Sequence, residues 1–558
     1  MATHKQLITI SDRVEAITVK LLLVLTFCML MTACDQKNRE VTENSDADQF
    51  LKSDAPALVI RLEGSDWGYP SPFTHYPRGP GGFKMALIFD SLLERDEKGL
   101  IPWLAESYRI DEGGLVYRFQ IRQGIRWQDG TPLTPEDVVF SLDYANRHAA
   151  TWSYIHEAVE AVTAEGNTVT VRMKKPQAVM LDNIGRTRII PKHIWEKVDR
   201  PKEFITPEAV IGCGPYRLTH YSKEHGTYRF EANEDYWGPK QRVDFIEFVP
   251  VSEPILAYEN GELDMIEVAP DVLPRFADDP DNKIIKNPAF WGYRLLMNIT
   301  KQELLQDVKV RQALAYAIDR DELVEKIERG AAVPGSLGIL PPDHIMAAKK
   351  MRQYLFDSRL AGALLDQSGF TQKNSEGIRF LPDGSLFALE LLCSSQEVRM
   401  AELIRQRLGE AGIELAIRSV DGKTRDVRVR KQEYQLAIIG HGGWGGDADY
   451  LVSHLSGDVF AQSESPSASG FGGVDDPVLM DLLHRQAVEI DPGKRGQLIG
   501  NIQEMAEELV PEIPLYYTAG FTMYSPLKYD GWMNMFDHHS LQHSKLSFLE
   551  RSGPAAIR

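Results

Sequence analysis

The sequence predicts a mixed α/β fold, and three observations lead to this prediction. Of the 558 residues, 43% are hydrophobic and 25% are charged, a composition typical of a globular protein with a large core. In the second half of the chain, segments with the alternation of strands follow segments with helical periodicity. The sequence shows no short-period repeat of the kind that indicates a solenoid. This pattern is typical of sheets covered by helices.

The first 33 residues are expected to be a signal peptide. An apolar run, Leu21 to Met31, follows Lys20; it is long enough for a signal and too short to span a bilayer as a helix. The run ends in Met31-Thr32-Ala33-Cys34, which resembles the bacterial lipobox, so Cys34 is the expected lipidation site. An uncleaved anchor and a plain secretory signal are the alternatives. With any of the three, the body of the protein is exported.

Residues 34–55 are expected to form a flexible tether, because the stretch after Cys34 is polar and nearly free of apolar side chains. Structure should begin near Pro56. No other apolar stretch has spanning length, so we expect a protein outside the membrane, held to it only by its anchor. Cys28 leaves with the signal, and neither a CxxC spacing nor a cysteine framework remains.

The formal net charge of the chain is −18 at pH 7. Binding to nucleic acid needs a basic face that neutralises phosphates. So large an excess of acid therefore argues against a nucleic-acid partner.

The first folded element should be a strand over residues 57–62, followed by a Gly/Pro-rich loop over residues 64–82. This loop carries Trp67, Phe73 and Tyr76. Aromatic side chains in such a loop suit a wall that faces a ligand, and an equally good interpretation is that Trp67 and Phe73 close the edge of a core.

A helix should begin at Pro135, because Thr134 is a good N-cap, proline favours the first helical position and Asp137 stands at the third. The other elements follow from periodicity. Helices are expected within residues 314–320, 360–365 and 401–408, and strands within residues 116–122, 386–392, 414–417 and 436–439.

Several motifs, taken in order, make the chain similar to family 5 of the bacterial extracellular solute-binding proteins, which serve importers of peptides, nickel and related ligands. Together they lie within residues 57–525, nearly all of the mature chain, so a chance match is far less probable than for one short motif. The motifs occupy residues 105–111, 117–141, 212–216, 233–238, 260–264 and 307–320. Each motif also has a structural explanation. Asp319-Arg320, for example, can be interpreted as a charge pair near a helix end.

The resemblance implies a two-lobed periplasmic-binding-protein type II fold with an enlarged first lobe and a hinge. Lobe I would comprise residues 56–290, lobe II residues 291–512, and residues 513–558 would return to lobe I. The chain would cross outward near Pro288 to Asn298 and back near Pro511 to Thr518. Cys213 and Cys393 would then lie on different lobes, so we expect no disulfide between them.

Peptide-binding members of the family carry a Trp-x-x-Asp segment after a strand, and its carboxylate pairs with the α-ammonium of the ligand. Trp444 and Asp447 match this pattern directly after the strand predicted at 436–439. The glycines around them would let the backbone approach the ligand closely. The alternative is a solvated acidic turn with Trp444 in the core.

Nickel-chelate members show a His-x-x-Trp segment at the same place, and His441 with Trp444 fits that as well. Residues 101–105 and the basic run that holds Arg186 and Arg188 also resemble that branch, in which an arginine contacts a carboxylate of the chelator. Either arginine would equally suit a peptide C-terminus, because a guanidinium binds any carboxylate. The sequence leaves the two substrate branches open.

His538, His539 and His543 are the remaining candidates for a metal site. No cysteine or carboxylate accompanies them at a ligand spacing, so we interpret them as a surface cluster and expect no metal and no cofactor. Against an exported enzyme, the sequence has no Gly-x-Ser-x-Gly, no His-Glu-x-x-His and no phosphate-binding loop. A signalling receptor or a chaperone on the same fold is a further alternative.

The resemblance therefore implies a monomeric, lipid-anchored binding protein of an ABC importer, either periplasmic or on the outer face of the cytoplasmic membrane. It would capture oligopeptides or dipeptides in the cleft between the lobes and deliver them to the permease, and the alternative ligand is a chelate of nickel or another metal. Its partners would be a peptide or a small chelate, the permease and ATPase complex, and the membrane through its anchor.

Overall fold

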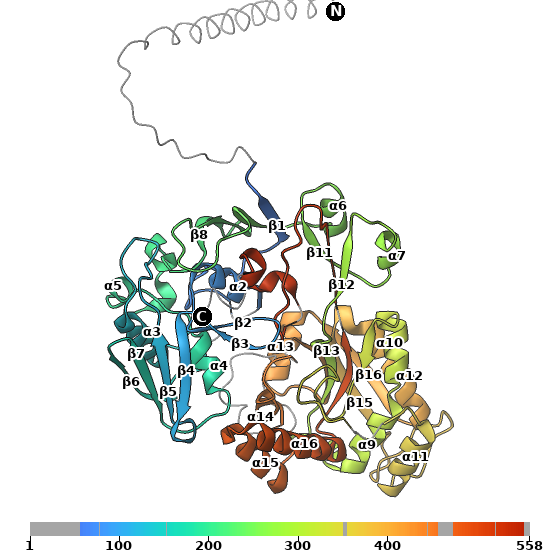
Figure 1. Ribbon diagram of the computed structural model, residues 1–558. Helices are drawn as coiled ribbons and strands as arrows, with labels where there is room; N and C mark the ends of the chain where they lie inside the picture. Colours follow the sequence, from blue (N-terminus) through green and yellow to red (C-terminus); the bar gives the residue numbers. More distant parts are fainter. Residues whose placement is uncertain are drawn as a thin grey trace, which may run out of the picture. The chain divides into compact units, whose positions relative to one another are not determined.

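The computed structural model describes residues 56–76, 79–151, 153–349, 354–442, 445–455, 473–518, 520–538 and 540–551. The signal peptide, Cys34 and the tether, together with Trp444 and His539, lie outside the described residues. The folded unit spans Ala57–Arg558. Its strands and helices alternate as expected, and they form three larger sheets and one strand pair (Figure 1).

A seven-stranded sheet begins with β1, which lies between two parallel neighbours, β10 and β11. The alternating residues of β1, predicted as the first strand, place Ile60 and Leu62 in the core. In spatial order the strands are β12 (Lys283–Lys286), β19 (Phe521–Tyr524), β11 (Met265–Val268), β1 (Val59–Glu63), β10 (Phe245–Val249), β9 (Thr227–Ala232) and β8 (Tyr216–Ser222).

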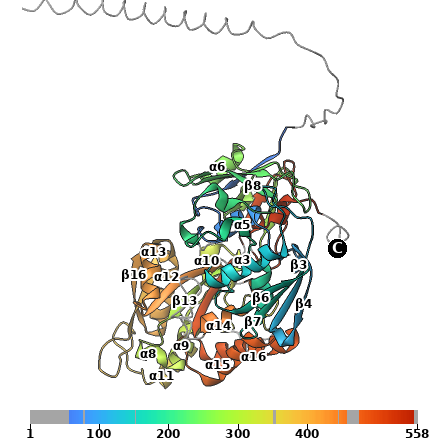
Figure 2. The ribbon, with the colours of Figure 1, turned by 90° about the vertical axis from the view of Figure 1, so that its left-hand side faces the viewer.

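A four-stranded antiparallel sheet is covered by α3 (Pro135–Arg147), which packs on β6 and β7 (Figure 2). This helix begins where the sequence predicts, and the backbone N–H of Thr134 donates to the Asp137 carboxylate at 2.8 Å. The strands are β4 (Ala105–Asp111), β5 (Val116–Ile121), β7 (Thr168–Met173) and β6 (Val159–Glu165). The strand pair is β2 (Leu93–Arg95) with β3 (Leu100–Pro102). Shorter helices follow as α2 (Gly79–Ile88), α4 (Met180–Arg186), α5 (Lys192–Trp195), α6 (Pro254–Glu259) and α7 (Leu273–Phe276).

A six-stranded sheet forms the core of the second half of the chain. Three of its strands, β15, β16 and β17, run parallel, so their carboxyl ends lie at one edge. The spatial order is β14 (Ala332–Pro334), β18 (Glu512–Thr518), β13 (Trp291–Met297), β17 (Leu436–Gly442), β15 (Ala388–Ser394) and β16 (Glu414–Val420). The strands predicted at 386–392, 414–417 and 436–439 are confirmed as β15, β16 and β17.

Helices surround this sheet (Figure 1), and they differ from the prediction at one point. The stretch 314–320 contains a helix boundary, because Asp319 caps a new helix through the backbone N–H of Glu322 at 2.9 Å. Arg320 donates to the Gly335 carbonyl at 2.7 Å, and the charge of Asp319 is among those that oppose the lowering of the Arg320 pKa by burial. The helices are α8 (Glu303–Gln306), α9 (Val308–Ala317), α10 (Arg320–Glu328), α11 (Ser358–Gln367), α12 (Val398–Ala411), α13 (Gly422–Arg430), α14 (Tyr450–Leu455), α15 (Pro477–Val488) and α16 (Pro492–Leu509).

The chain passes between the seven-stranded and six-stranded sheets twice, and the crossings touch each other. It leaves β12 for β13 through residues 287–290 and leaves β18 for β19 through residues 519–520. The backbone N–H of Asn287 donates to the Gly520 carbonyl at 2.9 Å, and its side-chain amide donates to Thr522 Oγ1 at 2.9 Å. Because β18 pairs within the six-stranded sheet, that sheet extends to Thr518.

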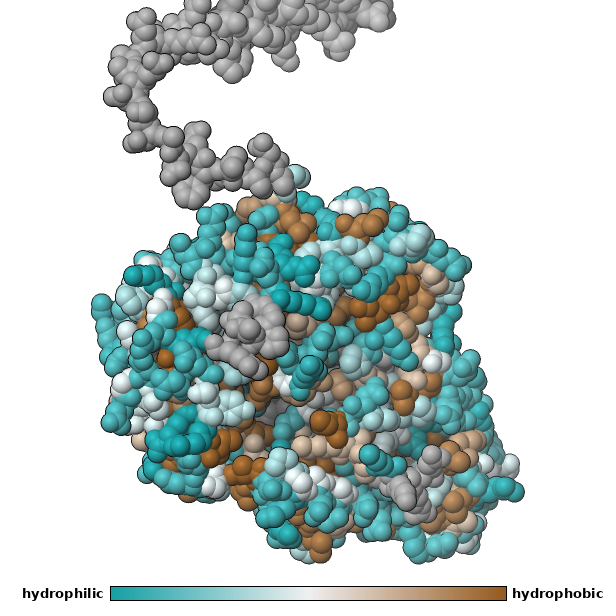
Figure 3. All heavy atoms as spheres, in the orientation of Figure 1, coloured by the Kyte–Doolittle hydropathy of each residue, from teal (hydrophilic) through white to brown (hydrophobic). Residues whose placement is uncertain are grey.

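The surface shown in Figure 3 is mostly hydrophilic, with scattered hydrophobic residues, as expected for a chain of net charge −18. Within the described part of the chain, no helix combines the length and the apolar character that a membrane crossing requires. Cys213 and Cys393 are both buried free thiols, which confirms the prediction that they do not pair.

Candidate functional site

The loop between β17 and α14 carries Asp447. Gly442, the last residue of β17, and Gly445 of the loop lie against the protein's own groups. A Cβ on Gly442 would come within 2.4 Å of Trp291 Cδ1, and one on Gly445 would come within 2.4 Å of the Asp537 carbonyl oxygen. The sequence predicts that these glycines admit a ligand. The structure gives them a different use, because they let the loop pass close to Trp291 and to the segment at Asp537.

The Asp447 carboxylate is bound by Arg495 of α16. Nη1 of Arg495 donates to Oδ2 of Asp447 at 2.8 Å, and Nη2 donates to Oδ1. The arginine side chain is 6% exposed and the aspartate side chain 35% exposed. Burial lowers the pKa of Arg495, but the bonded Asp447 outweighs this and the pKa lies above its usual value. Asp447 is therefore an aspartate already paired with a cation, and it remains partly open to solvent.

Further hydrogen bonds tie the loop to α15. The backbone N–H of Asp449 donates to Asp447 Oδ1 at 2.8 Å, and the Gln486 side-chain amide donates to Asp449 Oδ1 at 3.1 Å. Gln486 Oε1 also accepts from Arg495 Nη2 at 3.2 Å. Burial, followed by the charge of Asp447, raises the pKa of Asp449. The loop thus rests on two helices that follow it in the chain.

His441 lies near the end of β17, next to His454 and in the region of the buried ion pair between Arg294 and Glu512. Its ring centre is 5.2 Å from that of His454, and Arg294 Nη1 donates to Glu512 Oε2 at 2.8 Å with both side chains fully buried. Burial, then the charges of His454 and Arg294, places the pKa of His441 well below its ordinary value. His441 is therefore neutral near pH 7, the protonation state that binds metal ions.

Arg186, the last residue of α4, belongs to a second cluster of charged side chains. Its Nη2 donates to Asp182 Oδ2 at 2.7 Å, and Asp182 Oδ1 accepts from Arg95 Nη2 at 2.8 Å. Arg95 also bonds Asp537, the residue whose carbonyl meets Gly445. Burial lowers the pKa of Arg95 to about 10, with Arg186 acting in the same direction and Asp182 and Asp447 against it.

Asp447 and Arg186 thus belong to one region, because Arg95 bonds both Asp537, which lies against the Asp447 loop, and Asp182, which pairs with Arg186. Arg186 keeps 29% of its side chain exposed. Sequence reasoning missed Arg95, Asp182, Asp537 and Arg495. Only Arg495 has a local signal, a helix start at Asp491-Pro492, and this signal says nothing about its partner.

Arg188 is bound by groups of the protein itself, and its predicted contact with a ligand stays a prediction. Nη1 donates to Glu94 Oε1 at 2.7 Å, to Ser91 Oγ at 3.1 Å and to the Phe89 carbonyl at 3.3 Å. These bonds engage Nη1 with groups of the strand pair and of the segment before it. Its neighbour Arg186 is the arginine that remains accessible.

The three aromatic residues of the loop after β1 differ in their surroundings. Phe73 is 6% exposed and its ring centre lies 5.3 Å from that of Trp195, which favours the interpretation that it closes the edge of a core. Trp67 is partly buried, and its backbone exchanges hydrogen bonds with Tyr228 and Tyr76. Tyr76 is 51% exposed and remains available for a contact.

His538 and His543 form a partly buried pair, with Nε2 of one and Nδ1 of the other 2.7 Å apart. His543 stacks on Phe83 at 3.5 Å between ring centres. They are less exposed than the predicted surface cluster. Within the described ranges, no group of three or more His, Cys, Asp or Glu side chains has the arrangement of a metal site.

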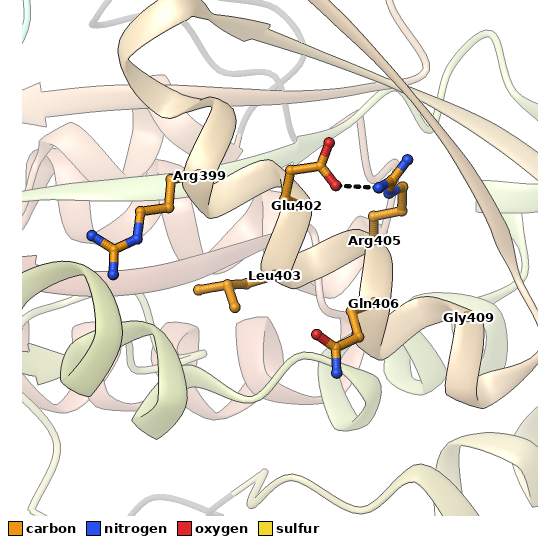
Figure 4. A pocket seen from close by; sticks show the side chains of 6 residues that line it. All are labelled: Arg399, Glu402, Leu403, Arg405, Gln406 and Gly409. Atoms are coloured by element: carbon orange, nitrogen blue, oxygen red, sulfur yellow. Dashed lines mark ion pairs between the residues drawn. The ribbon is translucent and has the colours of Figure 1, made fainter.

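A separate open hollow lies on α12, and Figure 4 shows the side chains that line it. Glu402 and Arg405 form an ion pair there. None of the predicted site residues lines the hollow, so we do not assign it to ligand binding. Its lining consists of Arg399, Glu402, Leu403, Arg405, Gln406 and Gly409.

Comparisons with known proteins identify the family and the fold. The family described as "Bacterial extracellular solute-binding proteins, family 5 Middle" matches residues 99–462. The dipeptide-binding protein of Escherichia coli strain K12 is 26% identical over 452 residues, which cover 76% of this chain and 82% of that protein. Heme-binding protein A of Haemophilus influenzae is 25% identical over 547 residues, covering 89% and 93%.

Solved structures share the fold over most of the chain. NikA from Brucella suis, in complex with Fe(III)-EDTA, has a TM-score of 0.74 at 22% identity and covers 88% of this chain and 99% of its own. The oligopeptide-binding protein AppA from Bacillus subtilis, in complex with a nonapeptide, has a TM-score of 0.71 at 20% identity, with coverages of 89% and 99%. The predicted two-lobed periplasmic-binding-protein fold is confirmed.

Proposed function

Because the chain belongs to family 5 of the bacterial extracellular solute-binding proteins, we propose that it captures small peptides between two lobes for an ABC importer. The similarity to the dipeptide-binding protein of Escherichia coli, over three quarters of the chain, supports a peptide ligand. The relatives are named as binding proteins, which supports a role in transport over the alternatives of an exported enzyme or a signalling receptor.

The observation that carries the proposal is a chain of contacts between the Asp447 loop and Arg186. Gly445 of that loop lies against the Asp537 carbonyl, Asp537 pairs with Arg95, and Arg95 and Arg186 share Asp182. The side chains of Asp447 and Arg186 are both partly exposed, and they have opposite charges. A free peptide carries an ammonium at one end and a carboxylate at the other. Asp447 would accept hydrogen bonds from the ammonium and Arg186 would donate to the carboxylate, in both cases through charge-assisted bonds.

We propose that the two lobes follow the sheets and turn about the adjacent crossings at residues 287–290 and 519–520. Away from these crossings, the backbone N–H of Ala178 donates to the Ala487 carbonyl at 2.8 Å, and a Cβ on Gly114 would lie 2.0 Å from Ile490 Cδ1. Such direct contacts suit a closed arrangement. Hinge closure of this kind would shield the ligand from water.

A metal chelate is the second candidate ligand, and the neutral state of His441 favours it. An uncharged imidazole can coordinate nickel or iron, and Arg186 would then bind a carboxylate of the chelator. The similarity to NikA in complex with Fe(III)-EDTA supports this alternative at the level of the fold.

Mass spectrometry of the ligand that copurifies with the native protein distinguishes these proposals. We expect peptides of mixed sequence, released by denaturation, and an equimolar metal content would instead support the chelate. Release of neither, together with no calorimetric binding of dipeptides, tripeptides or nickel–histidine complexes, would contradict both.

We also propose that the mature protein is a monomer held by an acylated Cys34 at the periplasmic side or outer face of the cytoplasmic membrane. The lipobox-like sequence before Cys34 supports the anchor. Acyl chains hold a protein at a membrane because each buried methylene contributes about 0.8 kcal/mol.

A further inference from the structure

We propose that Arg495 positions Asp447 and, by compensating its charge, sets how strictly the site requires a cationic group on the ligand. This inference rests on the proposed function, in which Asp447 receives the ligand's N-terminus. It assigns to Arg495 a role in specificity, although the arginine itself is too buried to touch the ligand.

The positioning follows from the hydrogen bonds. Arg495 engages both carboxylate oxygens of Asp447, the planar two-point arrangement that fixes a carboxylate in one orientation. Gln486 holds the guanidinium in turn, with Oε1 3.3 Å from Nε and 3.2 Å from Nη2 of Arg495. Asp447 therefore cannot turn toward a ligand without breaking these bonds.

The carboxylate keeps room for a ligand donor. Each carboxylate oxygen can accept about two hydrogen bonds. Among contacts between described residues, Oδ1 accepts from Arg495 and from the backbone of Asp449, whereas Oδ2 accepts only from Arg495. Oδ2 thus has one acceptor position that an N–H group of a ligand can use.

The charge of Arg495 determines what that N–H group must be. An isolated carboxylate shielded from water needs a cation, and it rejects a neutral donor because its charge stays uncompensated. With Arg495 in place, Asp447 has a cationic partner before the ligand arrives. The site should therefore accept a neutral N–H donor with only a moderate loss relative to an ammonium.

Calorimetry with trialanine and N-acetyl-trialanine tests this inference on the full mature chain. The measured quantity is the ratio of the two dissociation constants, acetylated over free. We expect Arg495→Met, which removes the cation and keeps an apolar chain, to raise this ratio at least about tenfold. Arg495→Lys keeps the charge without the two-point geometry, so it should weaken both peptides and leave the ratio within about twofold of wild type.

Arg485→Met is the matched control, because Arg485 lies on α15 and forms an exposed pair with Asp481 at 3.2 Å. It should change neither dissociation constant. Circular dichroism and thermal unfolding establish that each variant is folded. If Arg495→Met does not fold, Arg495→Lys is the test. Unchanged binding of both peptides by Arg495→Lys would overturn the inference.

Failure of the inference and failure of the proposed function give different results. A ratio that Arg495→Met leaves unchanged, with Asp447→Asn still weakening trialanine, would overturn the role of Arg495 alone. No binding of either peptide by the wild type, or no effect of Asp447→Asn, would overturn the role of Asp447 and this inference with it.

Discussion

Asp447 has two partners in the proposed function, the buried guanidinium of Arg495 and the ammonium of a ligand. From the sequence, a solvent-facing acidic residue on a glycine-rich loop should be replaceable without harm to folding. The ion pair with Arg495 changes that expectation. The arginine side chain is 6% exposed, so replacing Asp447 would leave a buried charge without its carboxylate partner.

Asp447→Asn should therefore reduce both binding and stability. We expect trialanine to bind more weakly by about 1.5–3 kcal/mol, the range for hydrogen bonds to charged groups. The free energy of unfolding should fall by about 2–3 kcal/mol, less than for a fully buried pair because Asp447 is partly exposed. Calorimetry and urea unfolding measure the two effects. A variant with wild-type stability would show that the pair with Arg495 contributes nothing to folding.

Phe73 differs from Asp447, because this predicted ligand-facing residue is buried in a hydrophobic core. Phe73→Ala should lower the free energy of unfolding by about 3–5 kcal/mol, because a buried aromatic ring leaves a cavity beside Trp195 and Tyr144. Tyr76→Ala, at a residue 51% exposed in the same loop, is the control and should change stability by no more than about 0.5 kcal/mol. Equal effects of the two variants in urea unfolding would contradict the core assignment.

Among the elements, α10 and α12 are joined by a two-point ion pair. Nε of Arg407 donates to Glu322 Oε2 at 2.7 Å and Nη2 donates to Oε1 at 2.8 Å. Bonding to Arg407 lowers the pKa of Glu322 to about 2, against a smaller opposing effect of burial. The pair fixes how these helices sit over the six-stranded sheet, and its effect on stability depends on pH.

A carboxyl group whose pKa is lower in the folded state stabilises the fold above its unfolded pKa and loses this effect as protons bind. The contribution of Glu322 should thus be complete above about pH 5 and decline between about pH 4.5 and 2. We expect Glu322→Gln to cost about 1–2 kcal/mol at pH 7 and about a quarter of that at pH 2.5, where the carboxyl group is still mostly ionised in the folded state. Urea unfolding at both pH values measures this, with Glu402→Gln on the exposed face of α12 as the control. A cost that is independent of pH would contradict the assignment.

At the scale of the whole molecule, the unit that begins at Ala57 contains both of the largest sheets, and adjacent crossings connect them. Cys213 packs in the core beside the four-stranded sheet, and Cys393 packs in the core of the six-stranded sheet. Separate cores leave each thiol without a partner cysteine, as the free state of both shows. A link between them would oppose the hinge motion that the proposed function requires.

Counting thiols in the mature protein tests the disulfide and the anchor together. We expect two alkylated cysteines after denaturation without reductant, because Cys28 is removed and Cys34 carries lipid. Mass spectrometry should locate both on Cys213 and Cys393, and neither should react in the native protein because both are buried. Three reactive thiols would show that Cys34 is not acylated. Cys34→Ala should move the protein out of the membrane fraction.

The sequence alone determined the kind of fold and the position of most elements. Period-two patterns predicted β1, β15, β16 and β17, and capping residues predicted the start of α3. It failed at 314–320, where apolar residues continue the helical pattern across a boundary that Asp319 sets by capping. Strand alternation and helix capping each depend on residues only a few positions apart in the chain. They can therefore be recognised without knowledge of the tertiary structure.

Only the tertiary structure decided which charged residues pair and which stay available to a ligand. Arg186 and Arg188 stand in one basic run, yet Arg188 is occupied by Glu94, which lies 94 residues away, whereas Arg186 remains partly exposed. Arg495 and Asp447 are 48 residues apart and have no sequence pattern in common. Pairing at such separations depends on how helices and sheets pack, because burial and distance set the electrostatic energy and local sequence encodes neither of them.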